Sequence, residues 1–272
     1  MKNVALGQYF PADSILHKLD PRMKIILAVV YIVLTFVCKN VLSFALLILS
    51  AFLLIFMSKI PLKIIMRSLR PVIFILLFTT VINVFWMRGD TLIFEWKFIH
   101  IYLEGIYQAI FIVVRIFSLI VGTSVLLTYT TTPIQLADGI EQLLAPLKKI
   151  KIPVHDFAML MTLALRFIPT LMEETDRIMM AQKSRGADFS SGGLIKRAKA
   201  LIPILIPLFV SAFRRADELA TAMECRCYHG GDGRTRMSVL RYSAKDFVFV
   251  SIMLILLGAV ITLNIISVGY TM

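Results

Sequence analysis

Two arginines have the residue type and the spacing expected of partner-binding residues. Arg185 and Arg226 each end a stretch of helical character, and each follows an aspartate by nine positions. The aligned residues are Asp176, Ala181 and Arg185 in the first stretch and Asp217, Ala222 and Arg226 in the second. A guanidinium is planar and permanently charged, so it can form bidentate hydrogen bonds to a carboxylate on a partner. A simpler interpretation is also open, because every helix favours a cation in its last turn.

The composition predicts that these arginines belong to an integral membrane protein. The chain has 272 residues, of which 58% are hydrophobic, and a formal net charge of +12. Soluble domains are roughly 45–50% apolar, so a large soluble core does not account for this content. In a membrane protein a positive balance indicates a basic cytoplasmic surface rather than a nucleic-acid partner. The three cysteines do not form a disulfide framework.

Five apolar runs predict membrane-spanning helices, since a span needs about 17–25 residues. They are residues 23–38, 41–57, 71–87, 101–129 and 247–266. We expect the first to begin at Asp20-Pro21, because aspartate caps a helix and proline suits its first position. The loop at 58–70 carries four basic and no acidic residues, whereas the charges at 88–97 cancel. This asymmetry predicts a multi-pass protein of the cell membrane with a cytoplasmic N-terminus.

Apolar and charged residues interleave between the fourth and fifth predicted spans. We expect three helices there, at residues 133–149, 154–185 and 194–228, of which the last two are long. Pro203 and Pro207 are expected to bend or break the third. Gly186 is placed to end the second helix in a left-handed conformation, and Gly230-Gly231 to end the third.

The predicted fold is therefore all-α, with about five transmembrane helices and a cytoplasmic or interfacial coupling region of three helices. The predicted parts are residues 1–132, 133–245 and 246–272. We expect the coupling helices to lie at or in the inner membrane face, in contact with lipid. An alternative remains open, in which residues 154–172 and 201–213 are two further spans.

The order of these features resembles the transmembrane T component of energy-coupling factor (ECF) transporters over essentially the whole chain. The resemblance rests on Leu19-Asp20-Pro21-Arg22, the spans and the polar helical region with two arginine motifs. It implies a non-catalytic scaffold that couples two ABC-type ATPases to a substrate-binding S component for uptake of vitamins or other micronutrients. The family's ATPase-docking motifs match Ser184, Arg185 and Gly186, and Cys225, Arg226 and Cys227. Cys227 replaces the second glycine, so we expect the two ends not to share a cap.

Methionines crowd the first of the two long helices. They are Met159, Met161, Met172, Met179 and Met180. Flexible thioethers can repack against different partners, and the resemblance implies that a T component receives S components, in some cases several kinds in turn. We therefore expect these residues to form an S-component surface, with ordinary apolar filling as the simpler interpretation.

Other chemistries find little support in the sequence. Gly192–Lys196 does not fit a nucleotide-binding P-loop, so ATP is expected on a partner. Cys225, Cys227 and His229 lie too close together on one helix end to converge on a metal, and no second cluster completes a site. We expect no metal and no cofactor. A hydrolase is also disfavoured, because the four histidines are scattered.

The alternative function is a self-sufficient secondary transporter that uses Arg115 and Glu104. An arginine inside a predicted span is a candidate functional residue. Glu104 precedes it by eleven residues, about 16 Å along a helix, and is not an obvious partner. We favour a structural Arg115 that either donates hydrogen bonds to backbone oxygens or packs against the polar helical region.

Overall fold

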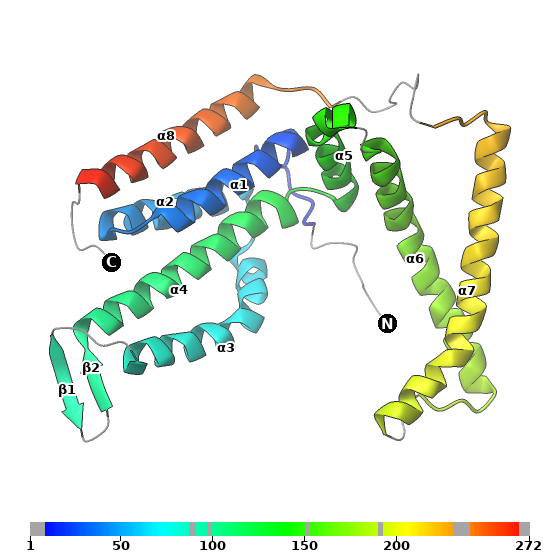
Figure 1. The fold of residues 1–272 in the computed structure, drawn as a ribbon, viewed down its shortest axis with the longest axis horizontal. Helices are drawn as coiled ribbons and strands as arrows, with labels where there is room; N and C mark the ends of the chain where they lie inside the picture. The colour runs from blue at the N-terminus through cyan, green and yellow to red at the C-terminus, as the bar shows by residue number, and fades with distance from the viewer. Residues whose placement is uncertain are drawn as a thin grey trace. The chain divides into compact units, whose positions relative to one another are not determined.

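The computed structural model describes residues 9–86, 91–96, 99–150, 153–189, 193–230 and 240–266, and within them the fold is helical apart from one hairpin (Figure 1). The elements are α1 (Pro21–Val37), α2 (Val41–Ser58), α3 (Leu62–Trp86), β1 (Leu92–Trp96), β2 (Ile99–Tyr102), α4 (Leu103–Thr123), the π-helix η1 (Ser124–Thr128), α5 (Pro133–Leu143), the 3₁₀ helix η2 (Ala145–Ile150), α6 (Val154–Ser184), α7 (Leu194–Cys225) and α8 (Ala244–Ile266). The predicted all-α membrane class is confirmed. The antiparallel β1–β2 hairpin was not predicted.

The chain divides into two compact units. One lies within Glu141–Val239 and contains α6 and α7; the other lies within Gly7–Ile140 and Leu240–Met272 and contains α1 to α4 and α8. The predicted division at residues 132 and 245 stays a prediction.

A tightly packed group of four helices forms the core of the larger unit. α1 contacts α4 and α8, and α2 contacts the same two helices (Figure 1). Tyr31, Leu34 and Leu47 are completely buried between them. Gly122 of α4 permits a close approach of Tyr31 of α1, since a Cβ there would lie 2.0 Å from Cε1 of Tyr31. Only a glycine fits at this helix crossing.

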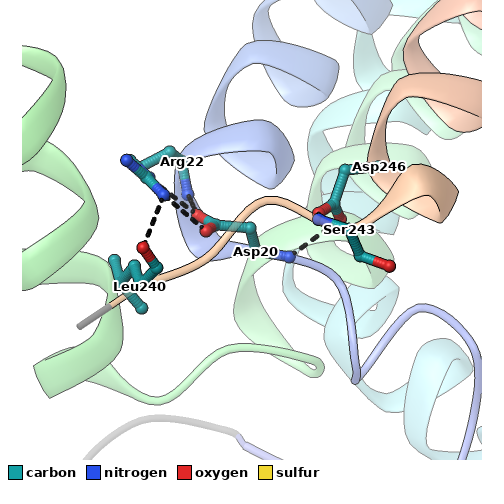
Figure 2. A network of polar contacts seen from close by, with 5 residues as sticks. All are labelled: Asp20, Arg22, Leu240, Ser243 and Asp246. Carbon is teal, nitrogen blue, oxygen red and sulfur yellow. Dashed lines mark hydrogen bonds and ion pairs between the residues drawn. The ribbon is translucent and has the colours of Figure 1, made fainter. Parts of the chain in front are cut away.

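A buried carboxylate joins the start of α1 to the start of α8. Asp246 is fully buried, and its Oδ1 accepts the backbone N–H of Asp20 at 3.0 Å (Figure 2). Its Oδ2 accepts the backbone N–H of Ser243 at 2.6 Å. Both helix starts are therefore held by one side chain, although they lie 226 residues apart in the sequence.

The side chain of Asp20 caps α1, as predicted. It accepts the backbone N–H of Arg22 at 2.9 Å and two guanidinium N–H groups of Arg22 at 3.0 and 2.8 Å. Arg22 also donates to the Leu240 carbonyl at 3.2 Å and lies 3.8 Å from the centre of the Tyr242 ring (Figure 2 shows all but the tyrosine). The segment that leads into α8 is thus fixed against the first turn of α1.

Lys24 completes the charge balance of this region. It is almost fully buried, and its Nζ donates to the carbonyls of Thr130 at 2.8 Å and His17 at 3.3 Å. Two aspartates and two cations therefore lie together at one end of the unit. Burying charges is tolerated only when they are paired and hydrogen-bonded. We name Asp20, Arg22, Lys24 and Asp246 the α1–α8 clamp.

Asparagines tie the opposite ends of α1 and α8. Asn264 donates to the Val37 carbonyl at 2.6 Å, and Asn40 donates to the Leu263 carbonyl at 3.0 Å. Ser43 donates to Oδ1 of Asn264 at 3.0 Å. These amides satisfy carbonyls at helix ends, which would otherwise lack intrahelical partners.

Five described helices are long and apolar enough to cross a membrane: α2, α3, α4 with η1, α6 and α8. The number agrees with the prediction, but the set differs by one helix. α1, which was predicted to span, has 17 residues and is not in the set. α6 was predicted at the membrane face and is in the set; its position there stays a prediction.

Two boundaries differ from the sequence prediction. α3 begins at Leu62 rather than at Pro71, so most of the predicted basic loop is helical. Pro71 lies inside the helix, which changes direction along its length (Figure 1). α7 continues through Pro203 and Pro207 without a break, but it changes direction along its length (Figure 1), so a bend and not a break is the outcome. It ends at Cys225 and not at Tyr228, whereas α6 ends within one residue of its predicted end.

The contact between Gly122 and Tyr31 predicts that alanine lowers stability at Gly122 but not at another helical glycine. Gly122→Ala forces the buried ring to move, and we expect a loss of about 1–3 kcal/mol of stability from overpacking. Gly258→Ala in α8 is the matched control, because nothing lies within 4 Å of its Cβ position and alanine favours a helix interior. Thermal unfolding in one detergent measures both. Equal unfolding temperatures for the two variants would contradict the packing.

The clamp predicts a larger loss when Asp246 is removed. Asp246→Ala leaves the buried N–H of Asp20 unsatisfied, at a cost of about 1–3 kcal/mol, and also removes the acceptor of the partly buried Ser243 N–H, so the unfolding temperature should fall markedly. Asp246→Asn keeps the shape and one acceptor oxygen, and should fall between Asp246→Ala and the unmodified chain. An Ala variant as stable as the parent would show that the clamp is dispensable.

Candidate functional site

The end of α6 places Arg185 at the C-cap, directly before a left-handed residue. Arg185 has φ −85° and ψ 7°, and Gly186 has φ +86°. The N–H of Gly186 donates to the Lys183 carbonyl at 3.0 Å, and that of Ala187 donates to the Gln182 carbonyl at 3.0 Å. This pair of bonds is a Schellman motif. The predicted role of Gly186 is confirmed.

The end of α7 has the same geometry, which corrects the expectation of two different caps. Arg226 is the C-cap with φ −94° and ψ 15°, and Cys227 takes the left-handed conformation with φ +56°. Its N–H donates to the Glu224 carbonyl at 2.8 Å, and that of Tyr228 donates to the Met223 carbonyl at 3.0 Å. The sequence prediction failed because it required a glycine at this position. A cysteine adopts the conformation at a steric cost of about 1–2 kcal/mol.

Both arginine motifs are accessible to a partner. Ser184, Arg185 and Gly186 are exposed, and so are Cys225, Arg226 and Cys227. Within the described residues, neither arginine is in an ion pair with an acidic side chain. Each guanidinium is therefore available for a carboxylate on another protein.

An ion pair lies where α6 and α7 cross. Nη2 of Arg215 donates to Oε2 of Glu174 at 2.9 Å, and both side chains are partly buried. Figure 1 shows the two helices crossing and running in opposite directions. On one side of the crossing, an apolar groove of about 370 Å³ lies between the two helices, lined by α6 residues from Met159 to Leu171 and α7 residues from Ala212 to Met223. Sequence reasoning missed this ion pair.

The ion pair follows the same repeat as the arginines. Glu174 precedes Arg185 by eleven residues, and Arg215 precedes Arg226 by eleven residues. α6 and α7 have 31 and 32 residues. Equivalent positions of the repeat that touch each other must lie close to an approximate two-fold axis. The offset that aligns the aspartates also aligns Glu174 with Arg215, but the alignment alone does not predict that their side chains meet.

This arrangement directs the two arginines away from each other. Each lies eleven residues beyond the crossing on antiparallel helices, and a helix rises about 1.5 Å per residue. Arg185 and Arg226 are therefore separated by on the order of 30 Å along the pair. Two binding sites, not one shared site, are required to engage both.

The five methionines do not gather on one face of α6. Met159 lines the groove against α7, whereas Met161 and Met180 are exposed. Met172 and Met179 are partly buried. Their role as an S-component surface stays a prediction.

Arg115 has the structural role that the sequence favoured. Its Nη2 donates to the Cys38 carbonyl at 2.9 Å, at the end of α1, and its guanidinium lies 5.4 Å from the centre of the Phe44 ring. Glu104 accepts the hydroxyl of Thr91 at 2.7 Å. Each residue of the alternative transporter pathway thus holds a local contact.

Metal ligation has no support among the described residues. They contain no group of three or more histidine, cysteine or acidic side chains placed to hold an ion. Cys225 and Cys227 are exposed free thiols. Gly192, part of the rejected P-loop match, lies outside the described residues.

Comparisons with known proteins agree with the resemblance seen in the sequence. Residues 12–239 match the family CbiQ, described as cobalt transport protein. The energy-coupling factor transporter transmembrane protein EcfT of Ruminiclostridium cellulolyticum is 52% identical over 97% of this chain and 98% of its own length. The EcfT proteins of Clostridium kluyveri and Bacillus subtilis are 52% and 47% identical, over 91% and 96% of this chain and 92% and 98% of their own lengths. The chain therefore belongs to the CbiQ family of energy-coupling factor transporter transmembrane proteins.

Proposed function

We propose that this chain is the non-catalytic coupling subunit of an ECF importer, and that Arg185 and Arg226 each bind one of two ABC-type ATPase subunits. The observation that carries the proposal is the pair of exposed arginines on matching caps, directed away from each other by one crossed helix pair. A C-cap guanidinium can form bidentate bonds to a carboxylate in a partner groove. The family membership supports an assembly of several subunits.

The crossed pair suits the transmission of movement. When nucleotide binding draws the two ATPases together, force acts on both arginine ends at once. α6 and α7 then rotate about the ion pair between Glu174 and Arg215, in which Nη2 of Arg215 lies 2.9 Å from Oε2 of Glu174. Rigid helices carry the displacement to the surface of the pair that binds the S component in this proposal.

The other parts of the proposal follow from the resemblance. An S component binds vitamins or other micronutrients and docks on α6 and α7, with Met161 and Met180 as exposed contacts. The chain lies in the plasma membrane with its N-terminus in the cytoplasm. The self-sufficient transporter is the weaker candidate, because Arg115 and Glu104 hold local contacts.

Charge reversal at the helix ends tests the docking role. Arg185→Glu and Arg226→Glu should each weaken ATPase binding by at least about thirtyfold, since losing one partner of a desolvated charge pair costs about 2–5 kcal/mol. The double variant should lose ATPase co-purification and uptake while remaining membrane-inserted. Co-purification from gentle detergent and substrate uptake by cells measure the two effects.

Arg214→Glu is the matched control for these variants. Its side chain is exposed on α7 and contacts only Glu218 at 3.7 Å among the described ion pairs. It should retain both ATPases and full uptake. A double variant with normal complex yield and normal uptake would overturn the proposed docking sites.

The shared cap predicts opposite effects at its two left-handed residues. Cys227→Gly removes strain and should slow amide exchange in the last turn of α7, by about 1–2 kcal/mol of local stability. Gly186→Ala introduces the same strain at α6 and should speed exchange there by a comparable amount. Hydrogen exchange read by mass spectrometry on peptides covering residues 180–189 and 221–230 measures both. Effects of the same sign would contradict equivalent caps.

A further inference from the structure

The arginine motif at the end of α7 carries two thiols that the motif of α6 lacks. Cys225 and Cys227 stand on either side of Arg226, where α6 has Ser184 and Gly186 around its own arginine. Both cysteines are free and exposed within their own compact unit. Two accessible thiols separated by one residue can act together in thiol–disulfide exchange.

The third cysteine of the chain is not accessible to the same chemistry. Cys38 is fully buried, and its thiol donates to the Leu34 carbonyl at 3.2 Å. A cysteine buried in a structural position is inert. Reagents that attack exposed thiols therefore act on this chain at the α7 motif.

The helix end holds the two exposed thiols apart. Arg226 keeps near-helical dihedral angles, φ −94° and ψ 15°, so the Cα atoms of Cys225 and Cys227 lie about 5–6 Å apart. A disulfide spans such a Cα separation, but it also needs Cβ atoms that point towards each other. Residues two positions apart on a helical turn do not face each other, so the backbone at Arg226 must rotate before the sulfur atoms can meet. This rotation breaks the cap hydrogen bonds that the Cys227 and Tyr228 N–H groups donate.

We propose that Cys225 and Cys227 form a reversible disulfide, and that closing this bond opens the α7 cap and withdraws Arg226 from its ATPase. The oxidant is a low-molecular-weight disulfide. The thiolate of one cysteine attacks it, forms a mixed disulfide and releases one small thiolate; the other cysteine then attacks the protein-bound sulfur and releases the second. Two cysteine thiols are oxidised, one external disulfide is reduced to two thiols, and these take up the two protons.

The bond has the properties of a switch rather than of a structural crosslink. A strained or exposed disulfide is reduced more easily than a structural one, and disulfides in reducing compartments are mainly transient or redox-sensing. The α6 motif has no thiol, so oxidation affects one of the two docking ends. The effect on docking rests on the proposed function, whereas formation of the bond and opening of the cap do not.

Oxidation of the full chain in detergent tests the bond and the cap. After treatment with glutathione disulfide, the peptide that contains both cysteines should be lighter by two hydrogens, and Cys38 should be unchanged. The amides of Cys227 and Tyr228 should lose protection from hydrogen exchange relative to the chain reduced with dithiothreitol. The corresponding cap amides of Gly186 and Ala187 are the matched control and should not change. Glutathione adducts without the bond, or a bond with unchanged exchange, would overturn the proposal.

Two single-ended chains test the effect on docking. Arg185→Glu leaves Arg226 as the docking end, and Arg226→Glu leaves Arg185. Each chain is oxidised before the ATPases are added, so that their own thiols stay reduced. The oxidised Arg185→Glu chain should lose ATPase co-purification and regain it with dithiothreitol, whereas the Arg226→Glu chain should not respond.

A third variant separates the bond from other oxidation. Adding Cys225→Ser to the Arg185→Glu chain should make its reduced and oxidised forms capture equal amounts of ATPase. Equal capture by the reduced and oxidised forms of the Arg185→Glu chain itself would overturn the switch. Failure of docking gives a different result, because neither single-ended chain then captures ATPase even when reduced, and the switch falls together with the docking role.

Discussion

One buried carboxylate determines how the larger unit closes. Asp246 accepts backbone N–H groups from Asp20 and Ser243, so the starts of α1 and α8 cannot separate without leaving the buried N–H of Asp20 unsatisfied. Arg22 and Lys24 balance the two aspartates and bind carbonyls of Leu240 and Thr130. The chain leaves this unit after Ile140, and its return at Leu240 is therefore fixed against the start of α1. α6 and α7, which lie between these two points in the sequence, form a separate compact unit.

α6 and α7 are related to each other by an approximate two-fold axis. Glu174 and Arg215 touch at the crossing, and each helix continues eleven residues to a C-cap arginine. Both arginines are the C-cap residue of a Schellman motif, although the left-handed residue that follows is Gly186 in one motif and Cys227 in the other. A partner that presents two similar grooves, one for each end, is the simplest complement to such a surface. Antiparallel direction keeps the two grooves apart.

Much of the fold follows from local patterns in the sequence. Apolar runs predicted α2, α4 and α8, and the cap chemistry of Asp20-Pro21 predicted the start of α1. Arg115 could be interpreted correctly because an intramembrane guanidinium needs acceptors, and backbone carbonyls at a helix end supply them. These features depend on neighbouring residues alone.

The failures share a different cause. Pro71 was taken as a helix start, but tertiary packing carries α3 through it. Cys227 was expected to disrupt the cap, yet the two Schellman hydrogen bonds outweigh its steric cost. The contacts of Asp246 with Asp20 and of Glu174 with Arg215 join residues far apart in the chain. Neither contact follows from a local pattern in the sequence.

The most direct test of the central claim is site-specific photo-crosslinking from the two arginine motifs in the intact complex. A photoreactive residue at position 184 or 225, with Arg185 and Arg226 unchanged, reports what lies within a few ångströms of each helix end. The account predicts that each position crosslinks to an ABC-type ATPase subunit, at equivalent surfaces on two separate subunits. Crosslinks from either position to lipid or to a small membrane protein, with no ATPase captured, would contradict it.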